Sequence, residues 1–528
     1  ERREKMKAEF TAFIKKWKNV FAADIVAGCI VYSLLMVNQL VNQLDGMWHG
    51  SISYAGAHEV GIGRWLWPLL DKGRGYLSPD PVTSIISVAV FAAAFILVMD
   101  AAGIGNRAAA YLGSFLFIVN TGILASLSYR YMSPTFAFSC FFAAAAGYLL
   151  VQVKVNGVLR NIACAAAGAV LIACMMGLYQ AELGCLCLLI LVYCLRKLIS
   201  GDGSLPDLGR KLVRALISLI FGALLYFAMV NVQLQVYDTS MSRYGGAENY
   251  GVAETISHFF ERIPATYRYF VYYYANDRIK TTYFPKEIYV LVYGIILLGF
   301  IPVIYRTIKR SIAGGVLAAV CLLLIPAACN SIFFIAFEAE PQIQMIIPVS
   351  MCIPLLLGMC LENTADIGWQ RYGRAAIPFV MGIVLYGSYI MTIYDQQSMY
   401  MGMNSMKELG SEIVTELIRD DLYHPYYSYV FVGRPADSPV YAKNDAVIAR
   451  ANRNAAMGTW NADDEKWATQ SWQSFWEHQM GIALKVAGED ALNAALSDPY
   501  VQSMPVFPER GSCALVNDVV VVKLAPVE

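Results

Sequence analysis

Long apolar segments alternate with short polar ones through the first three quarters of the chain. Apolar segments of about 18 or more residues have the length at which a helix crosses a lipid bilayer. About eleven such segments are predicted, at 19–43, 82–99, 108–127, 134–151, 161–178, 182–196, 212–235, 286–305, 312–336, 343–361 and 375–394. The sequence therefore predicts a polytopic α-helical membrane protein whose first partner is the lipid bilayer.

Basic residues at the ends of these segments predict the orientation. Residues 1–18 carry Arg2, Arg3 and five lysines directly before the first apolar segment. Positive charge that flanks a first span keeps that end in the cytoplasm. With an odd number of spans, the outer face receives the first loop (44–81), the long loop (236–285) and the chain after residue 395.

Residues 1–18 also have a helical pattern of their own. Phe10, Phe13, Ile14 and Trp17 recur at helical spacing, which predicts an amphipathic helix on the inner leaflet. The same basic residues would serve equally well as a topology signal alone, and the sequence leaves both interpretations open.

The composition becomes more polar after residue 395. Residues 398–421 and 464–483 have helical patterns, and Tyr427 to Val432 is a predicted strand. Two apolar runs flank Asn517 and Asp518, a pair typical of tight hairpin turns. Residues 396–528 are therefore predicted to form a small extracytoplasmic α/β domain, long enough to fold as a unit.

Composition excludes several functional classes. The chain is 57% hydrophobic and 15% charged, with a formal net charge of zero, so it shows no sign of a nucleic-acid partner. It has no phosphate-binding Gly-rich loop ending in Lys-Ser or Lys-Thr, no HExxH and no GxSxG. These absences argue against an ATP-driven pump and a membrane metalloprotease. Eleven of the twelve cysteines lie in apolar runs, so no disulfide framework is predicted.

The first outer loop concentrates the polar chemistry. Asp45 follows the first apolar segment at the depth of a lipid phosphate, where a carboxylate can act as general base on an acceptor hydroxyl. Arginine binds phosphate in a bidentate way and can hold the leaving group of a sugar transfer. The candidate catalytic acids are Asp45 and Glu59, and the candidate donor-binding residues are His58, Arg64, Trp65, Tyr129, Arg130, Tyr179, Gln180 and Arg262.

Structural alternatives exist for these residues. Asp45 can be a solvated residue after a helix, and Glu59 and Arg64 can form a structural ion pair. Gln180 can make a helix-to-helix hydrogen bond. The tyrosine-rich loop 236–285 suits a lipid-headgroup groove or a plain interfacial belt equally well. Two histidines with Asp45 could bind a divalent ion, but no strict spacing supports it, so no metal and no cofactor are predicted.

Three parts of the first outer loop resemble the bacterial membrane glucosyltransferases of the type II serotype-converting group. They are Asp45-Gly-Met-Trp-His, Ala57-His-Glu59-Val and Gly63-Arg64-Trp65. The turn Tyr129-Arg130-Tyr131, the hairpin Gly177-Leu-Tyr179-Gln180 and the polar tail look similar too. The likeness covers about residues 20–395 and, more loosely, the tail.

This resemblance implies a GT-C-like enzyme of the bacterial cytoplasmic membrane. Such an enzyme moves a sugar, typically glucose, from a polyprenyl-phosphate carrier to a cell-surface glycan such as O-antigen, with inversion and without a nucleotide sugar or metal. A donor-synthesising enzyme and a flippase are its implied partners. The family's catalytic Asp in the first outer loop corresponds to Asp45. Relatives often have two adjacent acids there, whereas the neighbour here is Gly46, so the second acid is missing or supplied by Glu59.

Two other functions remain to be distinguished from sugar transfer. A transporter or flippase of a lipid-linked sugar would need polar groups along a path through the bilayer centre, and the apolar segments are almost free of them. A non-catalytic assembly partner would tolerate loss of the first-loop acids.

Overall fold

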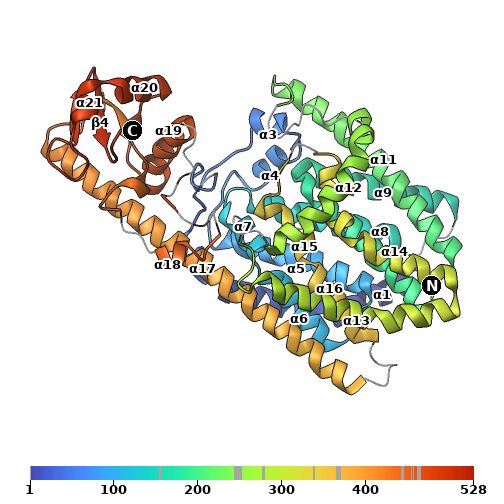
Figure 1. Cartoon of the computed structure of the whole chain (residues 1–528). Coiled ribbons are helices and arrows are strands. Elements are labelled where there is room, and N and C mark those ends of the chain that lie inside the picture. The colour runs from blue at the N-terminus through green and yellow to red at the C-terminus, as the bar shows by residue number, and fades with distance from the viewer. Residues whose placement is uncertain are drawn as a thin grey trace.

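The computed structural model describes residues 2–43, 45–153, 157–242, 252–275, 280–336, 339–363, 370–441, 445–452, 455, 457–458, 460 and 465–527. The chain forms a bundle of helices, and one long helix leaves the bundle to carry a small α/β domain (Figure 1). The N-terminus lies at the end of the bundle away from this domain (Figure 1).

The bundle is built from helices alone. Its first half contains α1 (Arg2–Val31), α2 (Ser33–Asn38), α3 (Ala57–Gly61), α4 (Trp67–Gly73), α5 (Val82–Ala102), α6 (Arg107–Ile118), α7 (Thr121–Ser128), α8 (Ser133–Val151), α9 (Val158–Leu178), η1 (Gln180–Glu182) and α10 (Leu183–Ser200). Its second half contains α11 (Leu205–Val236), α12 (Val252–Ala275), α13 (Lys286–Arg310), α14 (Ile312–Cys329), η3 (Ser331–Phe334), η4 (Ile343–Ile346), α15 (Ile347–Ser350), α16 (Cys352–Asn363) and α17 (Gln370–Arg419).

Nine helical spans in the described residues are long and apolar enough to cross a membrane. They coincide with predicted segments from residue 82 onward, and a bent pair of helices would make a tenth. The remaining predicted segment, 19–43, falls on α1 and α2. The multi-pass membrane character predicted from the apolar pattern is therefore confirmed.

The predicted single span 108–127 is wrong in detail, because the structure divides it into α6 and α7. The two helices meet at an angle of 42°. Asn120 between them is extended, and its side-chain oxygen accepts hydrogen bonds from the N–H groups of Gly122 and Ile123. An asparagine in this role begins a new helix. One polar residue inside a long apolar run was too weak a signal for this break.

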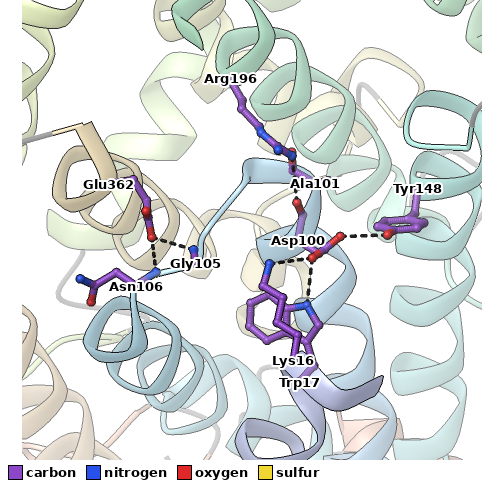
Figure 2. A network of polar contacts seen from close by, with 9 residues as sticks. All are labelled: Lys16, Trp17, Asp100, Ala101, Gly105, Asn106, Tyr148, Arg196 and Glu362. Carbon is purple, nitrogen blue, oxygen red and sulfur yellow. Dashed lines mark hydrogen bonds and ion pairs between the residues drawn. The ribbon is translucent and has the colours of Figure 1, made fainter. Parts of the chain in front are cut away.

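Residues 2–18 belong to α1, which continues without a break to Val31, and Phe10 and Ile14 are exposed on it. Figure 2 shows how α1 is attached to α5: Lys16 Nζ and Trp17 Nε1 both donate to Asp100 Oδ1, each at 2.9 Å. Tyr148 of α8 donates to the other oxygen of Asp100, also at 2.9 Å. Trp17 is buried in the protein rather than facing an inner leaflet. Three donors on one carboxylate therefore fix the start of the chain in the bundle.

Small residues let the helices approach closely. At Gly184 on α10, an added Cβ would lie 2.2 Å from the carbonyl oxygen of Cys329 at the end of α14. It would also lie 2.8 Å from the Pro348 ring. Backbone atoms cannot move out of the way as a flexible side chain can, so this contact requires glycine.

We therefore expect Gly184→Ala to destabilise the bundle by about 1–3 kcal/mol, the usual cost of overpacking a filled interior. The measurement is the thermal unfolding midpoint in detergent. Gly294→Ala on α13 is the matched control, because nothing lies within 4 Å of its added Cβ. Equal midpoints for the two variants would contradict the close α10–α14 contact.

The C-terminal domain contains one four-stranded sheet with the order β2-β1-β4-β3. β1 (Ser428–Val432) runs parallel to β2 (Lys485–Val486) and β4 (Val519–Lys523), while β3 (Cys513–Val516) and β4 are antiparallel. The domain's other elements are η6 (Pro435–Asp437), α18 (Asp445–Ile448), α19 (Glu465–Ser474), η7 (Phe475–Met480), α20 (Glu489–Ser497) and α21 (Pro499–Ser503). Asn517 and Asp518 both have positive φ in the β3–β4 turn, which confirms the predicted hairpin.

α17 joins the bundle to this domain. The predicted span 375–394 and the predicted helix 398–421 are one continuous helix of 50 residues, Gln370–Arg419. At 1.5 Å per residue it is about 75 Å long, more than twice the thickness of a bilayer core. Figure 1 shows it running along the bundle and ending under the C-terminal domain. The Asp395 carboxylate, halfway along, accepts a hydrogen bond from the Asn452 N–H of the domain.

Candidate active site

Residues 45–81, the first long loop of the chain, fold onto the turn between α9 and α10. The Leu66 N–H donates to the Gly177 carbonyl at 2.9 Å. The Gln180 side-chain amide donates to the Ile62 carbonyl and to the Tyr226 hydroxyl, each at 3.1 Å. The sequence presents this loop and this turn as two polar segments more than a hundred residues apart. The structure makes them one unit, at the end of the bundle where α3 and α4 lie in Figure 1.

Asp45 lies in a turn after α2 and is half-buried. Burial raises the pKa of its carboxyl, while the positive charges of Arg64 and, to a smaller extent, His58 oppose that rise. The negative charge of Asp45 also raises the pKa of the buried Tyr131, although burial is the larger cause. The predicted acid, the predicted arginine and His58 are therefore close enough to share one electrostatic environment.

Arg64 is held by aromatic rings. Its guanidinium carbon lies 5.4 Å from the centre of the Trp67 ring and 5.2 Å from that of Tyr179. Within the described part of the chain, its Nε is buried without a hydrogen-bond partner. Aromatic faces stabilise a guanidinium without using its N–H groups. Arg64 therefore keeps donors for an anion such as phosphate.

A buried ion pair supports the loop behind Arg64. Asp71 Oδ1 is 2.8 Å from Arg74 Nη2 and accepts a hydrogen bond from Trp67 Nε1 at 3.1 Å. Asp71 Oδ2 accepts the Ala55 N–H at 2.8 Å. Arg74 also donates to the Tyr131 carbonyl. This pair therefore connects three parts of the loop and orients Trp67, one of the rings against Arg64.

Aromatic stacking continues from Trp67 to the start of the loop. Tyr131 stacks on Trp67 with ring centres 5.8 Å apart, and on His49 with ring centres 3.8 Å apart. Burial lowers the pKa of His49 to about 4, with smaller contributions from His478 and His58. His49 is therefore neutral near pH 7 and serves as a flat surface rather than as a charge.

The C-terminal domain covers the start of the loop 45–81. Trp48 Nε1 donates to Ser471 Oγ of α19 at 3.1 Å. Gly50 lies against His478 of η7, whose Nδ1 would be 3.0 Å from a Cβ at that glycine. Residues more than 400 positions apart thus meet within a few residues of Asp45.

The remaining candidates of the first loop have structural contacts. Glu59 Oε2 accepts the Gly56 N–H at 2.6 Å and caps α3. Among the described residues it forms no ion pair with Arg64, so the alternative of a structural Glu59–Arg64 pair is not supported. Trp65 is buried over Gly177, where an added Cβ would lie 2.3 Å from its Nε1.

The other candidates differ in whether they lie with Arg64. Tyr129 and Tyr179 are buried, and both pack edge-on against the Phe136 ring. Arg130 is also buried, but its guanidinium donates to Gln39 at 3.0 Å and faces the charge of Asp80. Arg262 is on α12, which packs on η3 and α14. The structure therefore joins Tyr179 and Gln180 to Arg64 and does not join Arg130 or Arg262 to it.

Several residues of this cluster were missed by sequence reasoning. Trp67 is not among the candidates named from the sequence, and Tyr131 enters only as part of a turn. Tyr226 lies inside the apolar segment 212–235, where one tyrosine is an ordinary residue. Asp71 is one of several polar residues at the end of the loop. A charge eleven residues before the span that begins at Val82 could have indicated a supporting role for Asp71, whereas nothing in the sequence indicates Tyr226.

Comparison with protein families assigns the chain to a family. Residues 49–359, more than half of the chain, match the family described as glucosyl transferase GtrII. The match includes Glu59, Arg64, Tyr179 and Gln180 and begins four residues after Asp45. Neither the comparison with curated proteins nor that with solved structures gives a match. The chain belongs to the GtrII glucosyl transferase family.

Proposed function

We propose that this glucosyltransferase moves a sugar, in the first place glucose, from a polyprenyl-phosphate carrier to a cell-surface polysaccharide. The observation that carries the proposal is that Asp45 lies within the electrostatic reach of Arg64, whose guanidinium is placed by aromatic rings. The two opposite charges share one site at the rim of a membrane bundle, and Arg64 Nε remains free of hydrogen bonds within the described residues. A lipid-linked donor fits this position, because its phosphate stays at the rim while its chain lies in the bilayer.

The proposed chemistry is an inverting displacement. The acceptor hydroxyl attacks the anomeric carbon and gives its proton to the Asp45 carboxylate. The bond from the anomeric carbon to the carrier phosphate breaks, and the phosphate leaves with an additional negative charge. Arg64 stabilises this charge through its free N–H groups. Glu59 remains a second candidate acid.

The proposal includes the topology and the partners. The chain has eleven spans if α1 with α2 and the α6–α7 pair each cross the membrane, which is a GT-C-like plan. Its N-terminus is then cytoplasmic, and the C-terminal domain is outside the bacterial cytoplasmic membrane. A donor-synthesising enzyme and a flippase supply the carrier-linked sugar, and Arg130 and Arg262 are further candidate contacts for it. No metal or nucleotide takes part in the transfer step.

Reconstitution tests this function. The purified full chain in lipid nanodiscs is incubated with polyprenyl-phosphate glucose and bacterial surface glycans, and the products are analysed by mass spectrometry and for anomeric configuration. Transfer with inversion, and none from a nucleotide-linked glucose, is the expected result. Movement of the lipid-linked sugar across liposomes without a glycan product would instead indicate a transporter.

The pH dependence of the reaction is expected to report on the Asp45–Arg64 pair. Because the base must be ionised, kcat/KM falls as the pH decreases through the pKa of Asp45. The Arg64 charge lowers that pKa. Arg64→Gln should therefore raise it and move the acidic limb of the kcat/KM profile to higher pH, besides weakening donor binding.

The quantity to compare is the pH at which kcat/KM falls, rather than the maximal value of kcat/KM. Arg268→Gln removes one positive charge from an exposed position on α12 and is the matched control. An acidic limb at the same pH in the Arg64→Gln variant and in the wild-type protein would show that the titrating base is not beside Arg64.

A further inference from the structure

A carboxylate and two thiols meet beneath the turn between α9 and α10. Cys140 of α8, Glu182 of η1 and Cys185 of α10 are all fully buried. One ligand atom from each lies within 4.8 Å of the other two. The sulfur atoms of Cys140 and Cys185 are 3.8 Å apart, well beyond the length of a disulfide, and both thiols are free.

Glu182 has little to stabilise its charge. One carboxylate oxygen, Oε2, is 3.0 Å from Cys185 Sγ, while Oε1 is buried without a hydrogen-bond partner in the described part of the chain. No lysine or arginine of the described residues forms an ion pair with it. A buried carboxyl group at membrane depth is either protonated or balanced by a positive charge, and a bound cation would supply that charge.

The spacing of the sulfur atoms fits a metal ion. A zinc–thiolate bond is about 2.3 Å, so two thiolates on a tetrahedral ion lie about 3.8 Å apart. The thioether sulfur of Met351, directly before α16, is 3.9 Å from Cys185 Sγ and packs against this group. Sulfur and carboxylate ligands on one zinc ion lie about 3.6 Å apart, so binding would lengthen the Cys185–Glu182 contact by about 0.6 Å.

We propose that Cys140, Glu182 and Cys185 bind one structural Zn²⁺ ion. Binding displaces the protons of the two thiols to solvent, and the two thiolates and the carboxylate then face the two positive charges of the ion. The ion joins α8, η1 and α10. It lies below Tyr179 and Gln180, so it holds the turn that supports Arg64 without contacting the substrates. The proposal does not depend on the identity of the donor or acceptor.

Metal analysis of the purified full chain tests this site. The protein is stripped with a chelator, incubated with Zn²⁺ or Co²⁺ and separated from free ion. About one ion per chain and the visible spectrum of tetrahedral, thiolate-bound Co²⁺ are expected. Cys185→Ser should abolish both signals, and Glu182→Gln should weaken binding at least tenfold. Affinity should rise with pH, because binding releases protons.

The chain provides a matched control. Cys329 and Cys352 are a second pair of buried thiols, 3.2 Å apart, and the described residues place no carboxylate with them. Cys352→Ser should therefore bind the ion as the wild type does. Failure of the wild-type chain to bind Zn²⁺ or Co²⁺, or equal loss in Cys352→Ser and Cys185→Ser, would overturn the proposal.

Alkylation of the wild-type chain covers the case in which Cys185→Ser does not fold. Zn²⁺ should protect Cys140 and Cys185 from a membrane-permeable alkylating reagent after partial unfolding and leave Cys329 and Cys352 equally reactive with and without the ion. The readout is the mass of each cysteine-containing peptide. Equal labelling of Cys140 and Cys185 with and without Zn²⁺ would contradict the site.

Discussion

Replacing Asp45 by asparagine is expected to lower the rate of sugar transfer by about 10²–10⁴-fold, the usual contribution of a general base. The amide has the size of the carboxylate but cannot accept the proton of the acceptor hydroxyl. Because Arg64 and the aromatic rings around it are unchanged, the KM for the donor should stay close to that of the wild type. Steady-state kinetics with polyprenyl-phosphate glucose separate the two effects.

Two controls make this result specific. Asp490→Asn removes the same charge from an exposed position on α20 and should leave kcat unchanged. The thermal midpoint of Asp45→Asn should equal or exceed that of the wild type, because burial disfavours the charged carboxylate. Full turnover by Asp45→Asn would move the role of base to another acid, and Glu59→Gln would be the next variant to measure.

Asp71→Ala is expected to have the largest effect on stability, about 3–5 kcal/mol. The change removes three interactions at once: the ion pair with Arg74 and the hydrogen bonds from Trp67 and Ala55. It also leaves the Arg74 guanidinium without its counter-charge; two nitrogens of that group already lack partners in the described part of the chain. The expected results are a lower thermal midpoint in detergent and faster proteolysis within residues 44–81.

A double variant separates the effect of the unpaired Arg74 charge from the effect of the lost hydrogen bonds. Asp71→Asn with Arg74→Met replaces the pair by uncharged groups of similar volume, so no unpaired charge remains. Such replacements are often neutral, and this variant should recover most of the stability that Asp71→Ala loses. If the double variant is as unstable as Asp71→Ala, the hydrogen bonds to Trp67 and Ala55 hold the loop and the charge pair does not.

The apolar pattern predicted the helical spans because a bilayer requires long uninterrupted runs, whatever the contacts between helices. It failed where one residue changes the backbone locally. Asn120 begins α7 inside an apolar run. The junction near residue 395 shows no break in the helix, although the composition changes there. The composition of a segment indicates whether the segment lies in lipid or in water. It does not show whether the backbone hydrogen bonds of a helix continue through the segment.

The candidate site was predictable in part. Asp45 and Arg64 belong to one loop, so their proximity followed from the sequence, and the structure places them in one electrostatic environment. The contact between Arg64 and Tyr179 depends on how the loop folds over the α9–α10 turn. A contact between residues more than a hundred positions apart leaves no pattern in the local sequence around either residue. The same reason hides the Cys140–Cys185 pair, whose members appear in the sequence as two ordinary apolar positions.

The uninterrupted helix α17 fixes more than the distance of the C-terminal domain from the bundle. Each residue of an α-helix turns the chain by about 100°, so the number of residues between the bundle and Arg419 also sets the direction in which the domain faces. One residue inserted near the middle of α17 would swing Ser471 and His478 away from Trp48 and Gly50 while advancing the domain by only about 1.5 Å. Seven inserted residues would nearly restore the rotation but would move the domain by about 10.5 Å, so chains that keep the Trp48–Ser471 contact cannot change the length of this part of the helix.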